Sequence, residues 1–277
     1  MLSENEELKR DITTAFSKVS NVYDSGKNKF FSDIGKISAE KMNIAQGSTV
    51  LDIATGRGAF LYRAYDHSAP SGKVIGIDLA QGMIDSTTEE IKEKGLDIEL
   101  LLMDAEALDF EDNSFDYVFC GFAIFFFPNL ERALSEIYRV LKPNGKFGVS
   151  TFNADPVSDE EWFVDIIKKH LKRENHEEEQ EDKKTSPVFD TIEGMRNIFK
   201  GAGFNHIEVS NENLEYYYTE DEWWDELFTH GGIRTMDKFT SEKLELFKAD
   251  VYAKLRELKT AKGILRTISV LFTYGIK

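Results

Sequence analysis

The sequence has few of the residues that build covalent or metal-held sites. A single cysteine, Cys120, stands in the apolar run 115–122 of this 277-residue chain. It cannot form a disulfide within the chain, and we expect a buried packing residue, not a nucleophile. The five histidines are scattered, without an HExxH pattern or Cys and His at ligand spacing. The sequence therefore gives no support to a metal centre or to a cysteine triad.

Long apolar runs and positive charge are also scarce. No run approaches the roughly 18–20 apolar residues of a membrane span, and residues 1–10 lack the apolar centre of a signal peptide. Lys and Arg number 34 against 50 Asp and Glu, which gives a formal charge of −16. An acidic surface repels nucleic acid and anionic lipid. We expect a cytoplasmic monomer or homodimer that binds neither nucleic acid nor membranes.

The order of apolar patterns predicts an α/β fold. With 41% hydrophobic residues, the chain can bury a core and fold alone, as one large domain or as a core with a smaller lid. Up to about residue 150, strand-like runs alternate with helical patterns, and several runs are apolar throughout, as parallel strands covered on both faces require. The alternation predicts right-handed crossovers and a doubly wound sheet. The expected strands are 48–54, 73–78, 97–103, 115–122 and 145–152.

The clearest helix and the later half follow from the same patterns. Apolar residues recur at helical spacing from Leu130 to Leu141, and we expect Pro143 with Gly145 to end that helix. The charge run within 155–190 indicates a solvated helix face or loop. A helix over 191–204 precedes a strand over 205–218, at least two amphipathic helices fall within 219–259, and 264–276 supplies a final strand. No internal repeat or Pro-rich linker separates these segments.

A small-residue loop follows the first expected strand, in "VLDIATGRGAF" (50–60). Such a turn, at the carboxyl end of a strand and opening into a helix, is where doubly wound sheets bind ligands. Gly56 and Gly58 allow backbone torsions and close approach that a Cβ would block. Glycine turns after strands are common, however, and a purely structural turn explains this loop as well.

Two aspartates on the next strands favour a ligand site. Asp78 ends the second expected strand, about 20 residues downstream, where a carboxylate can accept hydrogen bonds from both ribose hydroxyls. Asp104 follows the third strand and could accept from an adenine amine. Either one alone is explained as a helix cap or turn residue. Asp52, Asp78 and Asp104 on three successive strands make coincidence less plausible.

A dinucleotide is the competing ligand, and its fingerprint is incomplete. The pattern G-x-G-x-x-G requires a third glycine, whereas residues 59–61 are Ala, Phe and Leu. Asp52 would repel a pyrophosphate but could help to hold a cationic amine. A ligand that joins adenosine to a charged amino acid fits better than one with two phosphates.

Four segments in order resemble the class I S-adenosylmethionine-dependent methyltransferases, in the branch of the ubiquinone/menaquinone C-methyltransferases. They are "VLDIATGRG" (50–58), "VIGIDLAQGMI" (74–84), "LLMDAEALDFEDNSFDYVFCGFAIFFFPN" (101–129) and "EIYRVLKPNGKFGVS" (136–150). The likeness runs from about residue 20 to 152. It implies a Rossmann-like, doubly wound seven-stranded sheet with the last strand antiparallel, N-terminal helices and helical lid insertions.

The resemblance also implies a cofactor and an organisation. S-Adenosyl-L-methionine would be the cofactor of a single domain (1–277), with an N-terminal helical cap (1–46), a cofactor-binding core (47–152) and lid insertions (156–190 and 219–262). Asp78 would hold the ribose, and Gly121 and Phe122 would face the methyl donor. The further cofactor-binding residues would be Tyr23, Asp52, Ala54, Gly56, Gly58, Leu79, Met83, Asp104 and Ala105.

Departures from the family bear on the acceptor. Ala54 replaces the first glycine of many relatives, which a small residue allows, and Phe125 and Phe126 stand where relatives often carry histidines. His230 is the remaining candidate for a catalytic base. Aromatic residues of the cap and lids favour an apolar, planar acceptor, although lid packing explains each one individually. They are Phe30, Phe31, Trp162, Phe163, Tyr216, Tyr217, Tyr218, Trp223, Trp224 and Phe228.

The sequence therefore predicts a methyltransferase for a small, apolar or aromatic organic molecule, methylated at O, N or C. Two alternatives stay open: an S-adenosylmethionine-binding partner or sensor without methyl transfer, and a macromolecule methyltransferase. The second is disfavoured by the acidic charge and by the absence of an Asn-Pro-Pro-Tyr type motif after the fourth strand.

Overall fold

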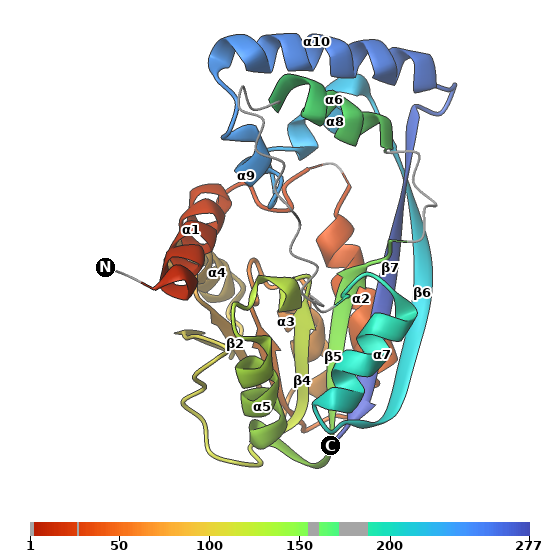
Figure 1. The fold of residues 1–277 in the computed structure, drawn as a ribbon. Coiled ribbons are helices and arrows are strands. Elements are labelled where there is room, and N and C mark those ends of the chain that lie inside the picture. Colours follow the sequence, from red (N-terminus) through yellow and green to blue (C-terminus); the bar gives the residue numbers. More distant parts are fainter. Residues whose placement is uncertain (1–2, 27, 155–160, 172–187) are drawn as a thin grey trace.

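The computed structural model describes residues 3–26, 28–154, 161–171 and 188–277. Within these ranges one seven-stranded sheet has the order β3-β2-β1-β4-β5-β7-β6 (Figure 1). β1 to β5 pair in parallel, and β7 is antiparallel to both β5 and β6. The sheet confirms the fold predicted from the sequence. The strands are β1 (Thr49–Ile53), β2 (Lys73–Asp78), β3 (Glu99–Leu102), β4 (Phe115–Gly121), β5 (Leu141–Phe152), β6 (Asn205–Tyr218) and β7 (Ile264–Ile276).

Helices cover both faces of the sheet because its central strands are apolar on both sides. Val50 and Val74 face α2, α3 and α4, whereas Leu51 and Val118 face α5 and α7. None of the helices in these ranges combines the length and apolarity needed to cross a bilayer. The helices are α1 (Glu4–Val19), α2 (Phe30–Met42), α3 (Leu61–Ser68), α4 (Gln81–Lys94), α5 (Leu130–Val140), α6 (Glu161–Leu171), α7 (Ile192–Gly201), α8 (Glu220–Glu226), α9 (Ile233–Met236) and α10 (Ser241–Leu258), with a 3-10 turn η1 (Ile124–Phe126).

The expected end of the helix before β5 was wrong. α5 stops at Val140, and Leu141 is already extended and pairs with Phe115 of β4. Leu141 is fully buried in this conformation, so strand pairing determines the helix end before Pro143 can act as a helix breaker. β5 therefore begins four residues earlier than the apolar run indicated.

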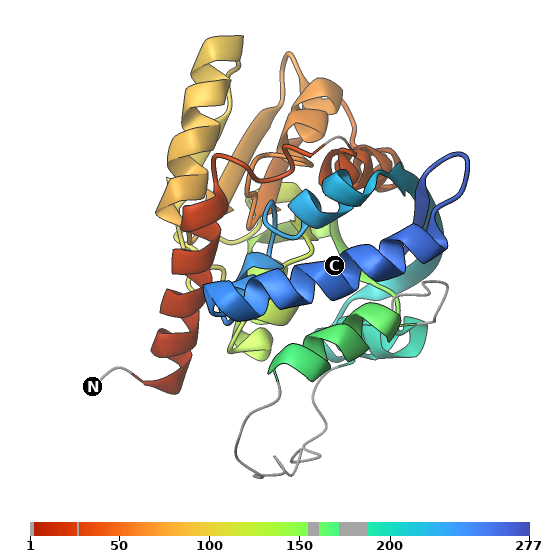
Figure 2. The same cartoon turned by 90° about the horizontal axis from the view of Figure 1, so that it is seen from above.

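The last two strands project past the rest of the sheet and carry a helical lid. β5 pairs with β7 only as far as Val270, whereas β6 and β7 stay paired to Tyr218 and Ile264. α8, α9 and α10 connect the far ends of this ribbon, and α10 crosses above the core with α6 beside it (Figures 1 and 2). Trp223, Phe247 and other apolar residues form a separate lid core.

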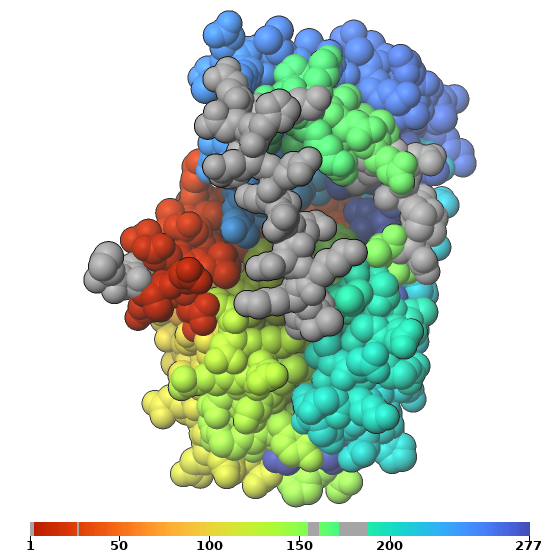
Figure 3. Space-filling view, viewed as in Figure 1, coloured from red at the N-terminus to blue at the C-terminus, as the bar shows by residue number. Residues whose placement is uncertain are grey.

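The segment between β5 and α7 is described only in part. α6 packs against α10, and its Trp162 and Phe163 contact Trp223 of the lid core. Most of the predicted lid insertion 156–190, including its charge run, lies outside the described residues. In the space-filling view the lid, in blue and green, stands over the core, with α1, in red, at one side (Figure 3).

Candidate functional site

A pocket opens where the carboxyl ends of β1, β2 and β4 meet. Chain order reverses between β1 and β4, and doubly wound sheets bind ligands at such a point. The space inside this pocket, its opening to solvent included, is about 790 Å³. We call it the edge pocket. Its lining from the core includes Tyr23, Ala54, Gly56, Asp78, Leu79, Met83, Asp104, Ala105, Gly121 and Phe122.

The loop after β1 leaves room for a ligand. Ala54, Gly56 and Gly58 all have positive φ angles, of 54°, 52° and 76°, which glycine adopts readily and alanine at some cost. A Cβ built on Gly56 meets no atom within 4 Å, whereas one on Gly58 would lie 2.8 Å from the ring of Tyr62. Gly56 thus borders open space in the edge pocket. Gly58 does not line that pocket and has a structural reason to be glycine.

Asp78 is held by the backbone around it. Its carboxylate accepts hydrogen bonds from the backbone N–H groups of Gly56 and Ala80, both at 2.8 Å. Burial raises the pKa of Asp78, and these N–H donors oppose that rise. Each carboxylate oxygen has a second lone pair. Asp78 can therefore accept further hydrogen bonds from a ligand with two hydroxyls, as the sequence predicted for a ribose.

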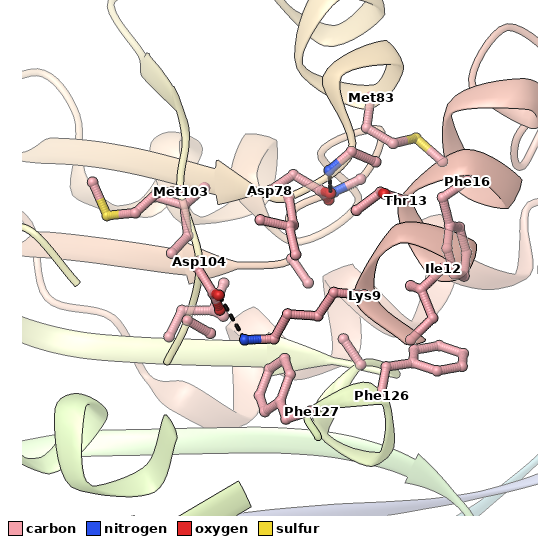
Figure 4. Close-up of a pocket in the computed structure, with 18 of the residues that line it drawn as sticks. Lys9, Ile12, Thr13, Phe16, Asp78, Met83, Met103, Asp104, Phe126 and Phe127 are labelled. Carbon is pink, nitrogen blue, oxygen red and sulfur yellow. Dashed lines mark hydrogen bonds and ion pairs between the residues drawn. The ribbon is translucent and has the colours of Figure 1, made fainter. Parts of the chain in front are cut away.

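Asp104 lies in the edge pocket with a partner that the sequence did not indicate. Lys9 of α1 reaches across the pocket, and its Nζ lies 2.7 Å from Asp104 and 2.6 Å from Glu106 (Figure 4). Burial lowers the pKa of Lys9, but the bonds to both carboxylates outweigh it and raise the pKa. Beside it, Ile12, Thr13 and Phe16 of α1 complete the wall. α1 is therefore a part of the site.

Asp52 lies behind the loop. Only 2% of its surface is exposed, Thr55 Oγ1 donates a hydrogen bond to it at 2.6 Å, and burial raises its pKa to about 7. Asp52 lines a smaller cavity that shares Ala54, Gly121 and Phe122 with the edge pocket. Direct contact of Asp52 with the cofactor stays a prediction.

A second hollow, the aromatic pocket, lies between the edge pocket and the lid. The two share Phe16, Tyr23, Phe122 and Phe126. Among the residues that line the aromatic pocket but not the edge pocket are Phe31, Phe125, Phe152, His230 and Arg234. Tyr23 stacks on Phe31, with ring centroids 5.1 Å apart. Among the ten aromatic residues singled out in the sequence, Phe31 is the one that lines this pocket. Most of the others pack inside the lid or against the sheet.

His230 lies in the aromatic pocket, but its surroundings disfavour the predicted role as a base. Its Nδ1 accepts a hydrogen bond from the backbone N–H of Gly232 at 3.0 Å, so the proton of the neutral ring sits on Nε2. Burial, and then the charge of Arg266, lower its pKa to about 4. Near pH 7 the ring is neutral and presents a donor at Nε2.

Comparisons with known proteins agree with this geometry. Residues 51–149 match the family model described as a methyltransferase domain. The chain is 34% identical over 149 residues to the aklanonic acid methyltransferase DauC of a Streptomyces species, which covers 53% of this chain and 68% of that protein. It is 28% identical over 232 residues to the demethylmenaquinone methyltransferase of Lactobacillus johnsonii. This match covers 76% of this chain and 91% of that protein.

A solved structure shows a similar fold. The phosphoethanolamine N-methyltransferase 2 of Haemonchus contortus, in complex with S-adenosyl-L-methionine, superposes with a TM-score of 0.58 at 21% identity, covering 100% of this chain and 60% of that one. At this level of identity the likeness concerns the fold alone.

Proposed function

Since the chain belongs to the class I S-adenosylmethionine-dependent methyltransferases, in the menaquinone-like branch, we propose that it methylates a small aromatic molecule seated in the aromatic pocket. S-Adenosyl-L-methionine is the cofactor of this family, and it supplies a methyl group on a positively charged sulfur that a nucleophile can attack. The proposal concerns the acceptor and the residues that position both molecules.

The edge pocket has a shape and donor set that fit the cofactor. Gly56 borders space that a Cβ would enter, and Asp78 presents a buried carboxylate to that space with lone pairs left to accept ribose hydroxyls. Met83 and Leu79 offer apolar surface for the adenine. Asp104 would accept a hydrogen bond from the adenine amine through the carboxylate lone pairs that the bond from Lys9 does not use.

The observation that carries the proposal is the wall common to both pockets. Phe16, Tyr23, Phe122 and Phe126 line the edge pocket on one side and the aromatic pocket on the other. Methyl transfer is an in-line displacement, so the enzyme chiefly has to align two molecules and exclude water. Planar rings around the junction bind a planar acceptor and keep water out. A base is needed only where the acceptor loses a proton.

The named acceptors of two relatives support a small molecule. Aklanonic acid methyltransferase and demethylmenaquinone methyltransferase both carry a small-molecule substrate in their names. In this chain the aromatic pocket would receive a molecule of that kind.

The test is turnover of methyl-labelled donor with a panel of quinols, phenols and amines. We expect label in at least one aromatic acceptor. Phe152→Ala removes a ring that lines only the aromatic pocket and should lower kcat/KM about tenfold while S-adenosylhomocysteine binds as before. Leu102→Ala, an exposed apolar residue elsewhere, is the matched control. Saturable binding of S-adenosylhomocysteine without labelling of any aromatic acceptor would instead favour a partner or sensor.

A further inference from the structure

Arg234 brings a positive charge into the aromatic pocket. It belongs to α9, is half-buried, and its guanidinium carbon lies 5.8 Å from the ring centroid of Phe126. In the described part of the chain, the structure gives this guanidinium no hydrogen bond and no ion pair. Its five N–H donors therefore have no acceptor among the described residues, and the side chain lines the aromatic pocket.

Two other arginines of this acidic protein, Arg57 and Arg139, form ion pairs with carboxylates. Arg57 pairs with Glu90 at 2.9 Å, and Arg139 pairs with Glu136 and Asp112 at 2.8 and 2.9 Å. The nearest acid along α9, Asp237, is already engaged, because both of its oxygens accept from Lys18 at 2.7 and 2.8 Å. Arg234 is thus left for a group that enters the pocket.

The charged residues around the aromatic pocket also favour an anionic ligand. Among the described residues, the acids that line it are Asp11 and Asp237, against four cations: Arg10, Lys18, Arg234 and Lys238. The described lining is therefore net positive in a chain whose formal charge is −16. A cationic acceptor such as an ammonium compound would be repelled from it, and an anion attracted.

His230 supplies the second polar group. Because its Nδ1 accepts from Gly232, its Nε2 carries the proton and can donate only to an oxygen or another acceptor. His230 and Arg234 lie four residues apart in one helical turn, in which Ile233 N–H donates to His230 and Arg234 N–H to Gly231. Both side chains line the same hollow.

We propose that Arg234, with His230 beside it, selects an acceptor whose planar ring carries an anionic oxygen group, namely an aromatic carboxylic acid. The inference rests on the proposed function and narrows it. A guanidinium binds a carboxylate through two parallel hydrogen bonds, and the neutral imidazole adds one more donor. The rings of Phe31, Phe122 and Phe126 hold the apolar plane of the same molecule. Arg234 and His230 thus act as specificity residues, not as a base.

The experiment compares two probes of one shape on the protein loaded with S-adenosylhomocysteine. 1-Naphthoate carries a carboxylate, and 1-naphthamide is its neutral counterpart. Isothermal titration should give at least tenfold tighter binding of the naphthoate. Arg234→Gln should reduce this preference to within twofold and leave naphthamide and S-adenosylhomocysteine binding unchanged. His230→Phe should weaken naphthoate binding more than threefold. Lys92→Gln, which removes an exposed cation outside this pocket, should change the preference by less than twofold.

The outcomes separate this inference from the proposed function. Equal binding of both probes, or a preference that survives Arg234→Gln, overturns the inference and leaves the aromatic acceptor in place. If neither probe binds although S-adenosylhomocysteine does, the aromatic pocket is not the acceptor site, and both statements are wrong.

Discussion

The ammonium of Lys9 lies 2.7 Å from a carboxylate oxygen of Asp104, the residue that the motif order assigns to the adenine amine. The same ammonium contacts Glu106, whose side chain is 9% exposed. Lys9 therefore fastens α1 across the edge pocket, and its neighbours Ile12 and Phe16 form a wall of that pocket (Figure 4). We therefore expect entry of the cofactor to depend on the opening of these ion pairs.

Lys9→Met should accelerate entry of the cofactor. The two ion pairs are partly exposed, which sets their worth at about 1 kcal/mol, or about fivefold in the opening of α1. We expect association of S-adenosylhomocysteine to be about fivefold faster at low salt, measured by stopped-flow tryptophan fluorescence. Added salt should raise the association rate of the wild type until it approaches that of the variant, because ions screen the attraction between Lys9 and its two carboxylates.

Arg10→Met is the control for that change. Arg10 lies next to Lys9 on α1, its side chain is 62% exposed, and among the described residues its ion pair is with Asp11, at 3.9 Å. The variant loses the same charge without releasing Asp104. Equal acceleration by both variants would mean that net charge, and not the anchor, controls entry.

Asp78→Ala should abolish cofactor binding. The backbone N–H groups of Gly56 and Ala80 lose their hydrogen-bond acceptor, and the ribose hydroxyls lose theirs. The loss of binding free energy therefore has two sources: unpaired N–H groups in the loop and missing hydrogen bonds to the ligand. We expect at least 100-fold weaker binding of S-adenosylhomocysteine by calorimetry. The exposed Asp85 of the next helix gives the matched control Asp85→Ala, with unchanged binding. Survival of tight binding in Asp78→Ala would disprove the assigned site.

Gly35→Ala should destabilise the protein through the loop that borders the edge pocket. A Cβ on Gly35 would overlap the carbonyl of Ala59 and lie 2.8 Å from the Phe60 nitrogen. Overpacking against backbone costs about 1–3 kcal/mol, and we expect a Tm lower by about 3–10 °C. Gly201→Ala, where the added Cβ meets nothing within 4 Å, should leave Tm unchanged or raise it slightly. Equal Tm values for the two variants would contradict this close approach.

Asp52→Asn should stabilise the protein at alkaline pH. The folded pKa of Asp52, about 7, lies above the ordinary value of 3.8 for an aspartate. Its contribution to stability is fully present below about pH 4 and is lost as the pH rises through 7. The asparagine does not titrate, so the gain of the variant over wild type should grow by about 2–3 kcal/mol between pH 5 and 8.

Urea unfolding at both pH values measures that gain. Asp85→Asn, which changes an exposed acid, should show no such growth. A constant difference between Asp52→Asn and wild type at pH 5 and 8 would show that Asp52 is ionised throughout that range.

The sequence could indicate which residues meet at the sheet edge because the signals for them are local. Gly56 follows β1 and Asp78 ends β2, and the parallel pairing of these strands brings the two residues together. Phe125 and Phe126 drew notice only as departures from relatives, although both line the aromatic pocket. Both residues belong to the three-residue turn η1 and line the pocket. An element this short has no hydrophobic periodicity from which it could be predicted.

Other parts of the site depend on packing between distant segments. Lys9 looks like an ordinary charge on an amphipathic helix, and its partners lie 95 and 97 residues away. Trp223 and Trp224 suggested pocket residues, but they meet Phe247 and its neighbours in the lid core. Tertiary contacts determine which apolar side chains of a lid face the pocket and which pack inside the lid. A single sequence does not show these contacts.

The ribbon of β6 and β7 acts as a spacer between two parts of the enzyme. Residues 264–269 of β7 pair with β6 but have no partner in β5, so their number contributes to how far the lid stands from the sheet. Each pair of residues added to both strands would raise the lid by about 7 Å and keep every side chain on its own face. Such a change would alter the depth of the acceptor pocket without touching a residue that holds the cofactor. Relatives with the same core could thus admit acceptors of different size through the length of this ribbon.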